Sequence, residues 1–286
     1  MHYVKSKSIL SKNNGMNLYR GCTHGCIYCD SRSEIYGMGH KFEDIEVKEN
    51  SLELLKKELI KRPKAMIGTG AMCDPYIPLE KDLEYVRRSL QLIYRYGFGF
   101  TCITKSDLIL RDLDLLKKIN EKARVVIQMT LTTADEDLCK ILEPNVCTTG
   151  RRVEVLNILK QAGIPTVVWL CPILPYINDT EENIKKILDY CIEADVKGIF
   201  CFEMGLTLRD GNREYFYDKL DEHFPGLKKR YIDEFGNDYS VPSPRNAELM
   251  KIFNQVTSQN GILNKFGDIF EYLHKFPQKS RQSRLI

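Results

Sequence analysis

The sequence lacks long apolar runs: no uninterrupted stretch approaches the roughly 18 residues that a membrane-spanning helix needs. Its first ten residues, MHYVKSKSIL, have no apolar core of the kind that a secretion signal carries. Internal repeats and low-complexity segments are also missing. We therefore expect a cytoplasmic protein with no membrane partner.

A strong excess of charge of one sign is missing as well. Lys and Arg number 42 against 39 Asp and Glu, a net charge of +3 that does not by itself indicate nucleic-acid binding. Hydrophobic residues make up 43% and charged residues 28%, which excludes a disordered chain. The 286 residues are enough for one large domain, or for an α/β barrel with an appendage.

Cysteine, in contrast, is plentiful, with ten residues. Without a secretion signal, this number argues against a disulfide scaffold and favours metal ligands or catalytic groups. Three of the ten lie within eight residues, and the others are scattered, mostly inside apolar runs.

Short apolar runs alternate with longer amphipathic ones. This pattern predicts βαβ units and a parallel sheet, either an open doubly wound sheet or a barrel. Six units in about 200 residues fit a partial (β/α)6 barrel of the TIM type. The candidate strands are 15–19, 65–69, 100–104, 125–131, 166–171 and 198–203; the candidate helices are 52–61, 81–96, 112–122, 151–162 and 181–194.

The character of the chain changes after Gly205, where charged and aromatic residues become frequent. We expect an N-terminal extension over 1–14, the barrel over 15–205, and a mainly helical C-terminal cap over 206–286. A further amphipathic helix is predicted at 246–259 within the cap, and the last nine residues, QKSRQSRLI, read as a basic tail.

The three clustered cysteines, Cys22, Cys26 and Cys29, have the spacing C-x3-C-x2-C and follow the first predicted strand. Soft thiolates select iron–sulfur clusters, zinc or Cu(I). A structural zinc site normally needs four protein ligands, and His24 inside the loop is a poor fourth ligand because it would strain the loop. A [4Fe–4S] cluster held by three cysteines would leave one iron open to a small molecule.

This segment resembles the signature of radical S-adenosylmethionine (SAM) enzymes, with Tyr28 as the aromatic residue before the last cysteine. The wider sequence is most similar to the branch that contains spore photoproduct lyase and DNA repair photolyase-like proteins. The matching stretches are NLYRGCTHGCIYC, GTGAMCDPYIPLE, TKSDLILRD, LEPNV, RRVEVLNILKQAGI and PILPYIND.

The resemblance implies a [4Fe–4S] cluster that binds SAM at its open iron and receives an electron from a flavodoxin- or ferredoxin-type reductant. The 5′-deoxyadenosyl radical so formed would abstract hydrogen from the substrate. By the same resemblance, Lys105 contacts the SAM carboxylate; a lysine that only reaches solvent is the alternative.

Cys73 falls where the lyase has a serine that touches SAM, whereas the hydrogen-donor cysteine of the lyase corresponds to Ala71. This departure makes Cys73 the candidate catalytic hydrogen donor, with a small buried hydrophobe as the alternative. Asp74 would orient the loop or SAM, or else cap the helix that begins near Glu80.

Further cofactor-binding residues are expected at the strand ends and beyond them, and a structural salt bridge explains the charged members nearly as well. They are Tyr28, Thr69, Thr130, Thr132, Glu143, Arg151, Arg152, Pro172 and Ile173.

Three functions compete. The first is repair of damaged DNA, which would place a flipped lesion at an opening lined by aromatic and basic residues. Tyr215, Phe216 and Tyr217 are candidates for that lining, although an aromatic stripe is more often core. The second is radical chemistry on a small molecule or a peptide. The third is a non-catalytic metal-binding module.

Overall fold

A six-stranded parallel sheet forms the centre of the computed structural model, which describes residues 1–277. The predicted basic tail, Gln278–Ile286, lies outside the described residues. In the order in which the strands lie side by side, the sheet contains β2 (Gly15–Met16), β5 (Met66–Thr69), β6 (Gly99–Thr104), β7 (Val125–Thr130), β8 (Thr166–Trp169) and β9 (Gly198–Phe200).

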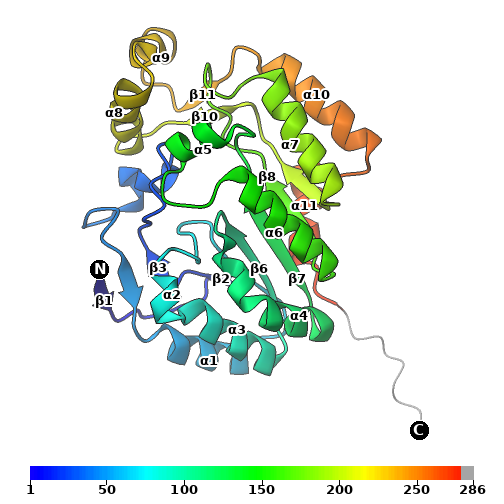
Figure 1. Cartoon of the computed structure of the whole chain (residues 1–286). Helices are drawn as coiled ribbons and strands as arrows, with labels where there is room; N and C mark the ends of the chain where they lie inside the picture. The colour runs from blue at the N-terminus through cyan, green and yellow to red at the C-terminus, as the bar shows by residue number, and fades with distance from the viewer. Residues whose placement is uncertain (278–286) are drawn as a thin grey trace.

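Helices cover the outer face of this sheet (Figure 1). All six residues of β7 are buried, as expected for a parallel strand covered on both faces. Within residues 1–277 the two edge strands, β2 and β9, do not pair with each other, so the barrel stays open. The predicted partial (β/α)6 barrel is confirmed. Its helices are α1 (Ser51–Lys61), α2 (Glu80–Leu83), α3 (Tyr85–Tyr96), α4 (Leu113–Lys122), α5 (Glu136–Leu142), α6 (Thr149–Gln161) and α7 (Glu181–Glu193).

The first predicted strand, 15–19, begins at the predicted residue but is shorter, since β2 ends at Met16. The chain leaves the central sheet after Met16, and β3 (Tyr19–Arg20) joins a second sheet, antiparallel to β4 (Glu46–Lys48). There β4 also pairs in parallel with β1 (His2–Val4). Leu18 and Tyr19, where the chain passes from one sheet to the other, are both buried in the core.

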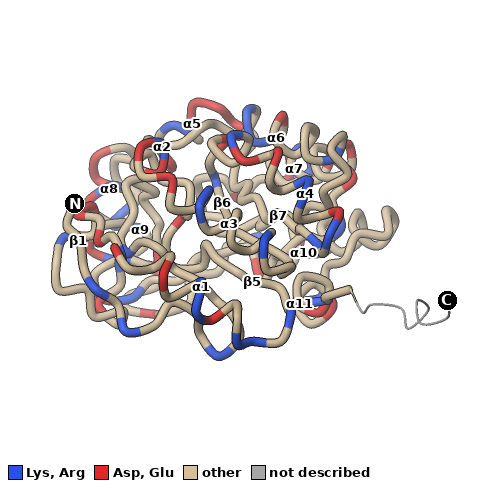
Figure 2. Tube along the Cα trace, turned by 90° about the horizontal axis from the view of Figure 1, so that it is seen from below, with Lys and Arg blue, Asp and Glu red and all other residues tan. Residues whose placement is uncertain are grey.

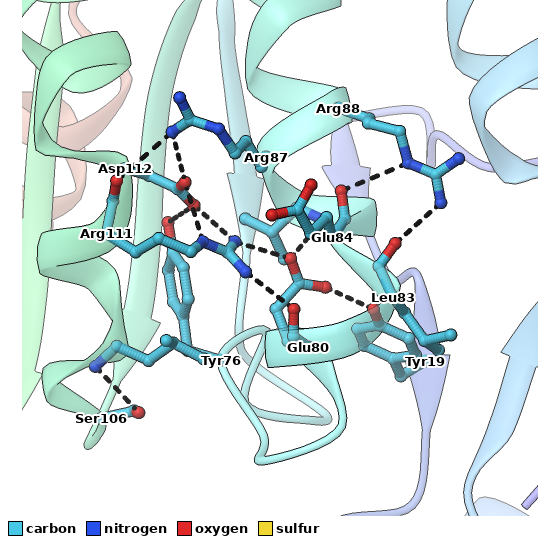
Figure 3. A network of polar contacts seen from close by, with 12 residues as sticks. Tyr19, Tyr76, Glu80, Leu83, Glu84, Arg87, Arg88, Ser106, Arg111 and Asp112 are labelled. Atoms are coloured by element: carbon cyan, nitrogen blue, oxygen red, sulfur yellow. Dashed lines mark hydrogen bonds and ion pairs between the residues drawn. The ribbon is translucent and has the colours of Figure 1, made fainter.

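The predicted helix 81–96 is interrupted at Glu84, which has a left-handed backbone with φ of +52°. The cause is the fully buried carboxylate of Glu80, which needs donors (Figure 3). It accepts the backbone N–H of Val86 at 3.0 Å, an Arg111 N–H at 2.8 Å and the hydroxyl of Tyr19. By taking the N–H of Val86, it ends one helix and starts the next.

Beyond Gly205 the chain first builds over the carboxyl edge of the sheet. Strands β10 (Gly205–Thr207) and β11 (Ser240–Pro242) form an antiparallel pair, with α8 (Asn212–His223) and α9 (Leu227–Phe235) between them. Phe216 and Tyr231 from these helices share one hydrophobic cluster with Cys26, Ile27 and Tyr28. The segment therefore packs directly on the cysteine loop.

The last two helices return to the barrel. Helix α10 (Asn246–Gln259) packs on α7, and α11 (Phe266–His274) packs on β9. Ile269 and Leu273 of α11 are buried against Val126, Val167 and Phe200. The C-terminal helix thus covers one end of the inner face of the open sheet. No helix within residues 1–277 is long and apolar enough to cross a bilayer.

Substituting Glu80 should destabilise the fold strongly. Glu80→Ala leaves the Tyr19 hydroxyl and the Val86 N–H without their buried acceptor, while Arg111 keeps Asp112, and we expect a loss of about 3 kcal/mol in the free energy of unfolding. Urea denaturation measures this, with Glu121→Ala on the exposed face of α4 as the control. Equal midpoints for the two variants would contradict the role given to Glu80.

Candidate functional site

The three clustered cysteines meet at the carboxyl edge of the sheet. Cys22, Cys26 and Cys29 line one cavity of about 110 Å³, together with Cys73 and Lys105. The carboxyl ends of parallel strands are the usual place for an active site in barrel proteins.

The segment after α5 holds the cysteine loop from one side. The N–H of Ile27 donates to the carbonyl of Leu142, and the N–H of Asn145 donates to the carbonyl of His24, both at 3.0 Å. Gly25 has φ of +74°, and a Cβ there would lie 3.0 Å from the Asn145 amide nitrogen and 3.1 Å from Pro144. Glycine at this position allows the two segments to approach closely.

On the other side, the loop is bonded to a segment near β4 and to Cys73. The N–H of Cys22 donates to the carbonyl of Phe42 at 3.1 Å, and the Cys73 thiol donates to the carbonyl of Gly21 at 2.7 Å. The neighbouring Cys73 and His24 lower the pKa of Cys22 well below its usual value, and the proximity of Cys22 and burial raise the pKa of Cys73. Cys22 is therefore favoured as a thiolate, the form that binds metal.

Burial raises the pKa values of Cys26 and Cys29, and the charge of Lys105 opposes this rise in both. A bound metal deprotonates a coordinating thiol outright. Three sulfur donors on one curled loop, without a fourth cysteine in that loop, fit a [4Fe–4S] cluster with one iron left open.

Asp74 ties three parts of the site together. Its carboxylate accepts from the Thr104 hydroxyl and from the N–H groups of Lys105 and Tyr76, each at 2.8 Å. It also pairs with His24 of the cysteine loop at 3.4 Å. Of the two roles predicted for Asp74, these contacts favour orienting the loop over capping a helix.

A fully buried ion pair lies behind the cysteine loop. The guanidinium of Arg152 pairs with the carboxylate of Glu143, which also accepts the hydroxyl of Tyr28. Arg152 further donates to the carbonyls of Thr130, at 3.2 Å, and Cys147, at 2.9 Å. Burial alone would raise the pKa of Glu143, but the charges of Arg152 and Lys105 outweigh it and lower the pKa.

Lys105 carries a positive charge into this buried site. Burial opposes that charge, but Cys26 and Glu143 outweigh burial and raise the pKa of Lys105. Its ammonium lies 5.8 Å from the centre of the Tyr28 ring. Because two cations, Lys105 and Arg152, share the carboxylate of Glu143, an anionic group would be attracted to the cavity.

A second cavity, of about 570 Å³, shares a wall with the first. Cys29, Lys105 and Thr130 line both cavities. Burial raises the pKa of Cys171, in the larger cavity, to about 12, so this thiol stays protonated. The wall of the larger cavity is rich in aromatic side chains, namely Tyr28, Tyr36, Trp169, Phe202 and Tyr239.

The two cavities bring together many of the predicted site residues: the three cysteines, Tyr28, Cys73, Asp74, Lys105, Thr130 and Pro172. Neither cavity is lined by Thr69, Thr132, Glu143, Arg152 or Ile173. Of these, Thr132 lies 3.5 Å from the carboxylate of Glu143, in the layer behind the cavities, and Ile173 belongs to the core.

Arg151 lies away from both cavities, although it is the neighbour of Arg152. Its side chain is 41% exposed and pairs with Asp107 at 2.9 Å and Glu154 at 2.7 Å. The aromatic residues considered for the opening, Tyr215, Phe216 and Tyr217, do not line either cavity. Phe216 and Tyr217 are buried in the α8–α9 cluster instead.

Several lining residues escaped the sequence analysis. Trp169 is the single tryptophan and ends β8, so its place at a strand end was a usable signal. Phe202 follows β9 in the same way. Tyr239 had no such signal, because only the β10–β11 pairing brings residues near 240 to the site.

An open parallel barrel with three convergent cysteines at its carboxyl edge defines a class: barrel proteins that hold a metal cluster through three thiolates. The family model of the radical SAM superfamily matches residues 16–191, and the chain belongs to that superfamily.

Two relatives share much of the sequence. A protein of Methanocaldococcus jannaschii is 31% identical over 233 residues, covering 78% of this chain and 84% of the relative. A protein of Mycobacterium tuberculosis is 27% identical over 267 residues, covering 87% of this chain and 77% of the relative.

Solved structures share the fold. Spore photoproduct lyase in complex with dinucleoside spore photoproduct is 14% identical, with a TM-score of 0.64, covering 92% of this chain and 80% of the lyase. The radical SAM methyltransferase TsrM of Kitasatospora setae, with cobalamin and a [4Fe–4S] cluster bound, is 13% identical with a TM-score of 0.55. That match covers 96% of this chain and 54% of TsrM. The two predicted cofactors, a [4Fe–4S] cluster and SAM, are confirmed as those of the family.

The neighbouring residues Arg151 and Arg152 provide a matched test of the buried ion pair. Arg152→Ala leaves the Glu143 carboxylate buried and unpaired, and we expect a loss of about 3–5 kcal/mol in the free energy of unfolding, with reduced iron content. Arg151→Ala removes only exposed pairs and should leave stability nearly unchanged. Urea denaturation and iron analysis of both variants decide this; equal losses would contradict the assignment.

Proposed function

We propose that the protein is an enzyme that cleaves SAM reductively and uses the product to abstract hydrogen from a substrate in the larger cavity. The observation that carries this proposal is the wall that the two cavities share, at Cys29, Lys105 and Thr130. When bound, the cluster supplies the electron that breaks the sulfonium bond of SAM and yields the 5′-deoxyadenosyl radical.

The side chains of this protein would position the reactants. Cys22, Cys26 and Cys29 would each hold one iron. Lys105, whose raised pKa keeps it charged, would bind the SAM carboxylate. Thr130 and Pro172 line the wall where the nucleoside part would lie. The electron would come from a flavodoxin- or ferredoxin-type protein.

Glu143 and Arg152, from behind the cavity, and Tyr28, in the wall of the larger cavity, would act as positioning residues that hold Lys105 and the cysteine loop in place. Thr69, Thr132 and Ile173 would support the same wall. Arg151 is not part of this arrangement, because its guanidinium forms ion pairs with Asp107 and Glu154 at the surface.

The predicted role of Cys73 as hydrogen donor would require its thiol to face the substrate. Cys73 lines the smaller cavity, and its thiol donates to the carbonyl of Gly21 beside Cys22. This geometry supports a positioning role for Cys73, which anchors the backbone of the cysteine loop beside Cys22.

Damaged DNA is the first candidate substrate. Phe202 and Tyr239 line the larger cavity and remain 56% and 50% exposed. The guanidinium of Arg209 lies 4.7 Å from the centre of the Tyr239 ring. Exposed aromatic rings beside a cation are suited to stacking an unpaired base.

A small molecule or a peptide is the second candidate. Figure 2 shows Lys and Arg interspersed with Asp and Glu along residues 1–277, where no one-signed stripe of the kind that a DNA backbone would favour is present. Asp30 and Glu203 also line the larger cavity. Its volume of about 570 Å³ falls within the range of roughly 300–1,000 Å³ for small-molecule sites.

Replacing any of the three cluster cysteines by alanine should abolish reductive cleavage of SAM, because the cluster loses a ligand. Formation of 5′-deoxyadenosine by anaerobic, dithionite-reduced protein measures this. Cys191→Ala, a core thiol on α7, is the matched control and should keep activity. Cys73→Ala should retain iron and still react with substrate. If this variant cleaved SAM but no longer returned a hydrogen atom to the substrate radical, Cys73 would be the hydrogen donor after all.

The two substrate candidates differ in their dependence on salt. If lesion-containing DNA is the substrate, its affinity should fall steeply with salt and weaken several-fold in Phe202→Ala and Tyr239→Ala. The exposed residue Tyr94 on α3, replaced by alanine, is the control. DNA binding that is absent, or unchanged in both cavity variants, would favour a small molecule or a peptide.

A further inference from the structure

A second group of potential metal ligands lies outside both cavities, on the small sheet of β1, β4 and β3. His2, His40 and Asp44 each offer a ligand atom, and these atoms lie within 4.8 Å of one another. The Nδ1 atom of His2 is 3.0 Å from Asp44 Oδ2. The two imidazole rings meet edge to face, with 4.8 Å between their centres.

Glu46 lies next to this group, although it is not among the three residues whose ligand atoms lie within 4.8 Å of one another. It lies opposite His2 in the parallel register of β1 and β4, and its carboxylate is 3.7 Å from His40 Nε2. The side chains of His40 and Glu46 are only 17% and 16% exposed. Among residues 1–277, the buried Nε2 atom of His40 has no hydrogen-bond partner.

We propose that His2, His40, Asp44 and Glu46 form a binding site for a divalent transition metal, with zinc as the preferred ion. Two imidazoles with two carboxylates match the nitrogen and oxygen ligands of zinc, whereas magnesium and calcium prefer oxygen alone. A bound ion would use the unpartnered nitrogen of His40. With Glu46 turned toward the ion as a fourth ligand, the site would be closed and structural rather than catalytic.

The metal site would stabilise the segment that supports the cysteine loop. A bound ion would link strand β1 to residues 40–46. Phe42, within that segment, accepts the N–H of Cys22 at 3.1 Å. The guanidinium of Arg32, which follows the cysteines, lies 4.4 Å from the centre of the Phe42 ring. A metal here would therefore hold the segment on which Cys22 rests, without touching the cluster.

The test uses the full chain without an N-terminal tag, with its cluster reconstituted anaerobically, then incubated with zinc sulfate and desalted. We expect about one zinc ion per chain in addition to the cluster iron. X-ray absorption at the zinc edge should give nitrogen and oxygen ligands at about 2.0–2.1 Å, and no sulfur at about 2.3 Å.

Variants connect the ion to these residues. His40→Ala and Asp44→Asn should each lose the zinc while keeping the cluster iron. His223 is an exposed histidine on α8 that pairs with Glu222, so His223→Ala is the matched control and should keep the zinc. Because two different ligands are replaced, a folding defect in one variant leaves the other informative.

Three results would overturn the proposal. They are a reconstituted protein that retains no zinc, zinc bound through sulfur, and zinc content that is unchanged in both His40→Ala and Asp44→Asn. None of these results depends on SAM cleavage, so the proposed function can stand or fall independently of the zinc site.

Discussion

The site depends on one buried interaction, the ion pair of Glu143 and Arg152. Removing one partner of such a pair leaves an uncompensated buried charge, which is why it constrains its surroundings. Glu143 holds the hydroxyl of Tyr28, and Arg152 holds the carbonyl at the end of β7. The residues next to Glu143 then fix the cysteine loop through the backbone bonds of Leu142 and Asn145. The position of the cysteines over the sheet thus follows from this pair.

The same charges prepare the cavities for their ligands. The negative charge of Glu143 stabilises the positive charges of both Arg152 and Lys105. Lys105 therefore stays charged in a buried place where an anion would be bound. Packing separates this polar region from the rest of the barrel. Ile269 and Leu273 of α11 cover one end of the inner face, while β10 and β11 bring Tyr239 to the larger cavity at the other. The C-terminal part of the chain therefore both covers one end of the inner face of the open sheet and supplies part of the wall of the larger cavity.

Local signals were sufficient for much of this arrangement. The C-x3-C-x2-C spacing predicted the cysteine site, and apolar runs located the six central strands within a few residues. Tertiary contacts decided the rest. Glu84 breaks a helix because the buried carboxylate of Glu80 takes a neighbouring N–H. Arg151 and Arg152 are equivalent in sequence, and only burial distinguishes them. Tyr239 reaches the cavity through the pairing of β10 with β11, which the local sequence around Tyr239 does not predict.

Electron paramagnetic resonance of the reconstituted, dithionite-reduced protein, recorded with and without SAM, tests the central claim most directly. An open iron beside the charged Lys105 should bind SAM, so the account predicts a reduced [4Fe–4S] signal that changes when SAM is added. Lys105→Met should weaken that response while the signal without SAM stays the same. A cluster whose signal is indifferent to SAM, or zinc bound by Cys22, Cys26 and Cys29, would contradict the account.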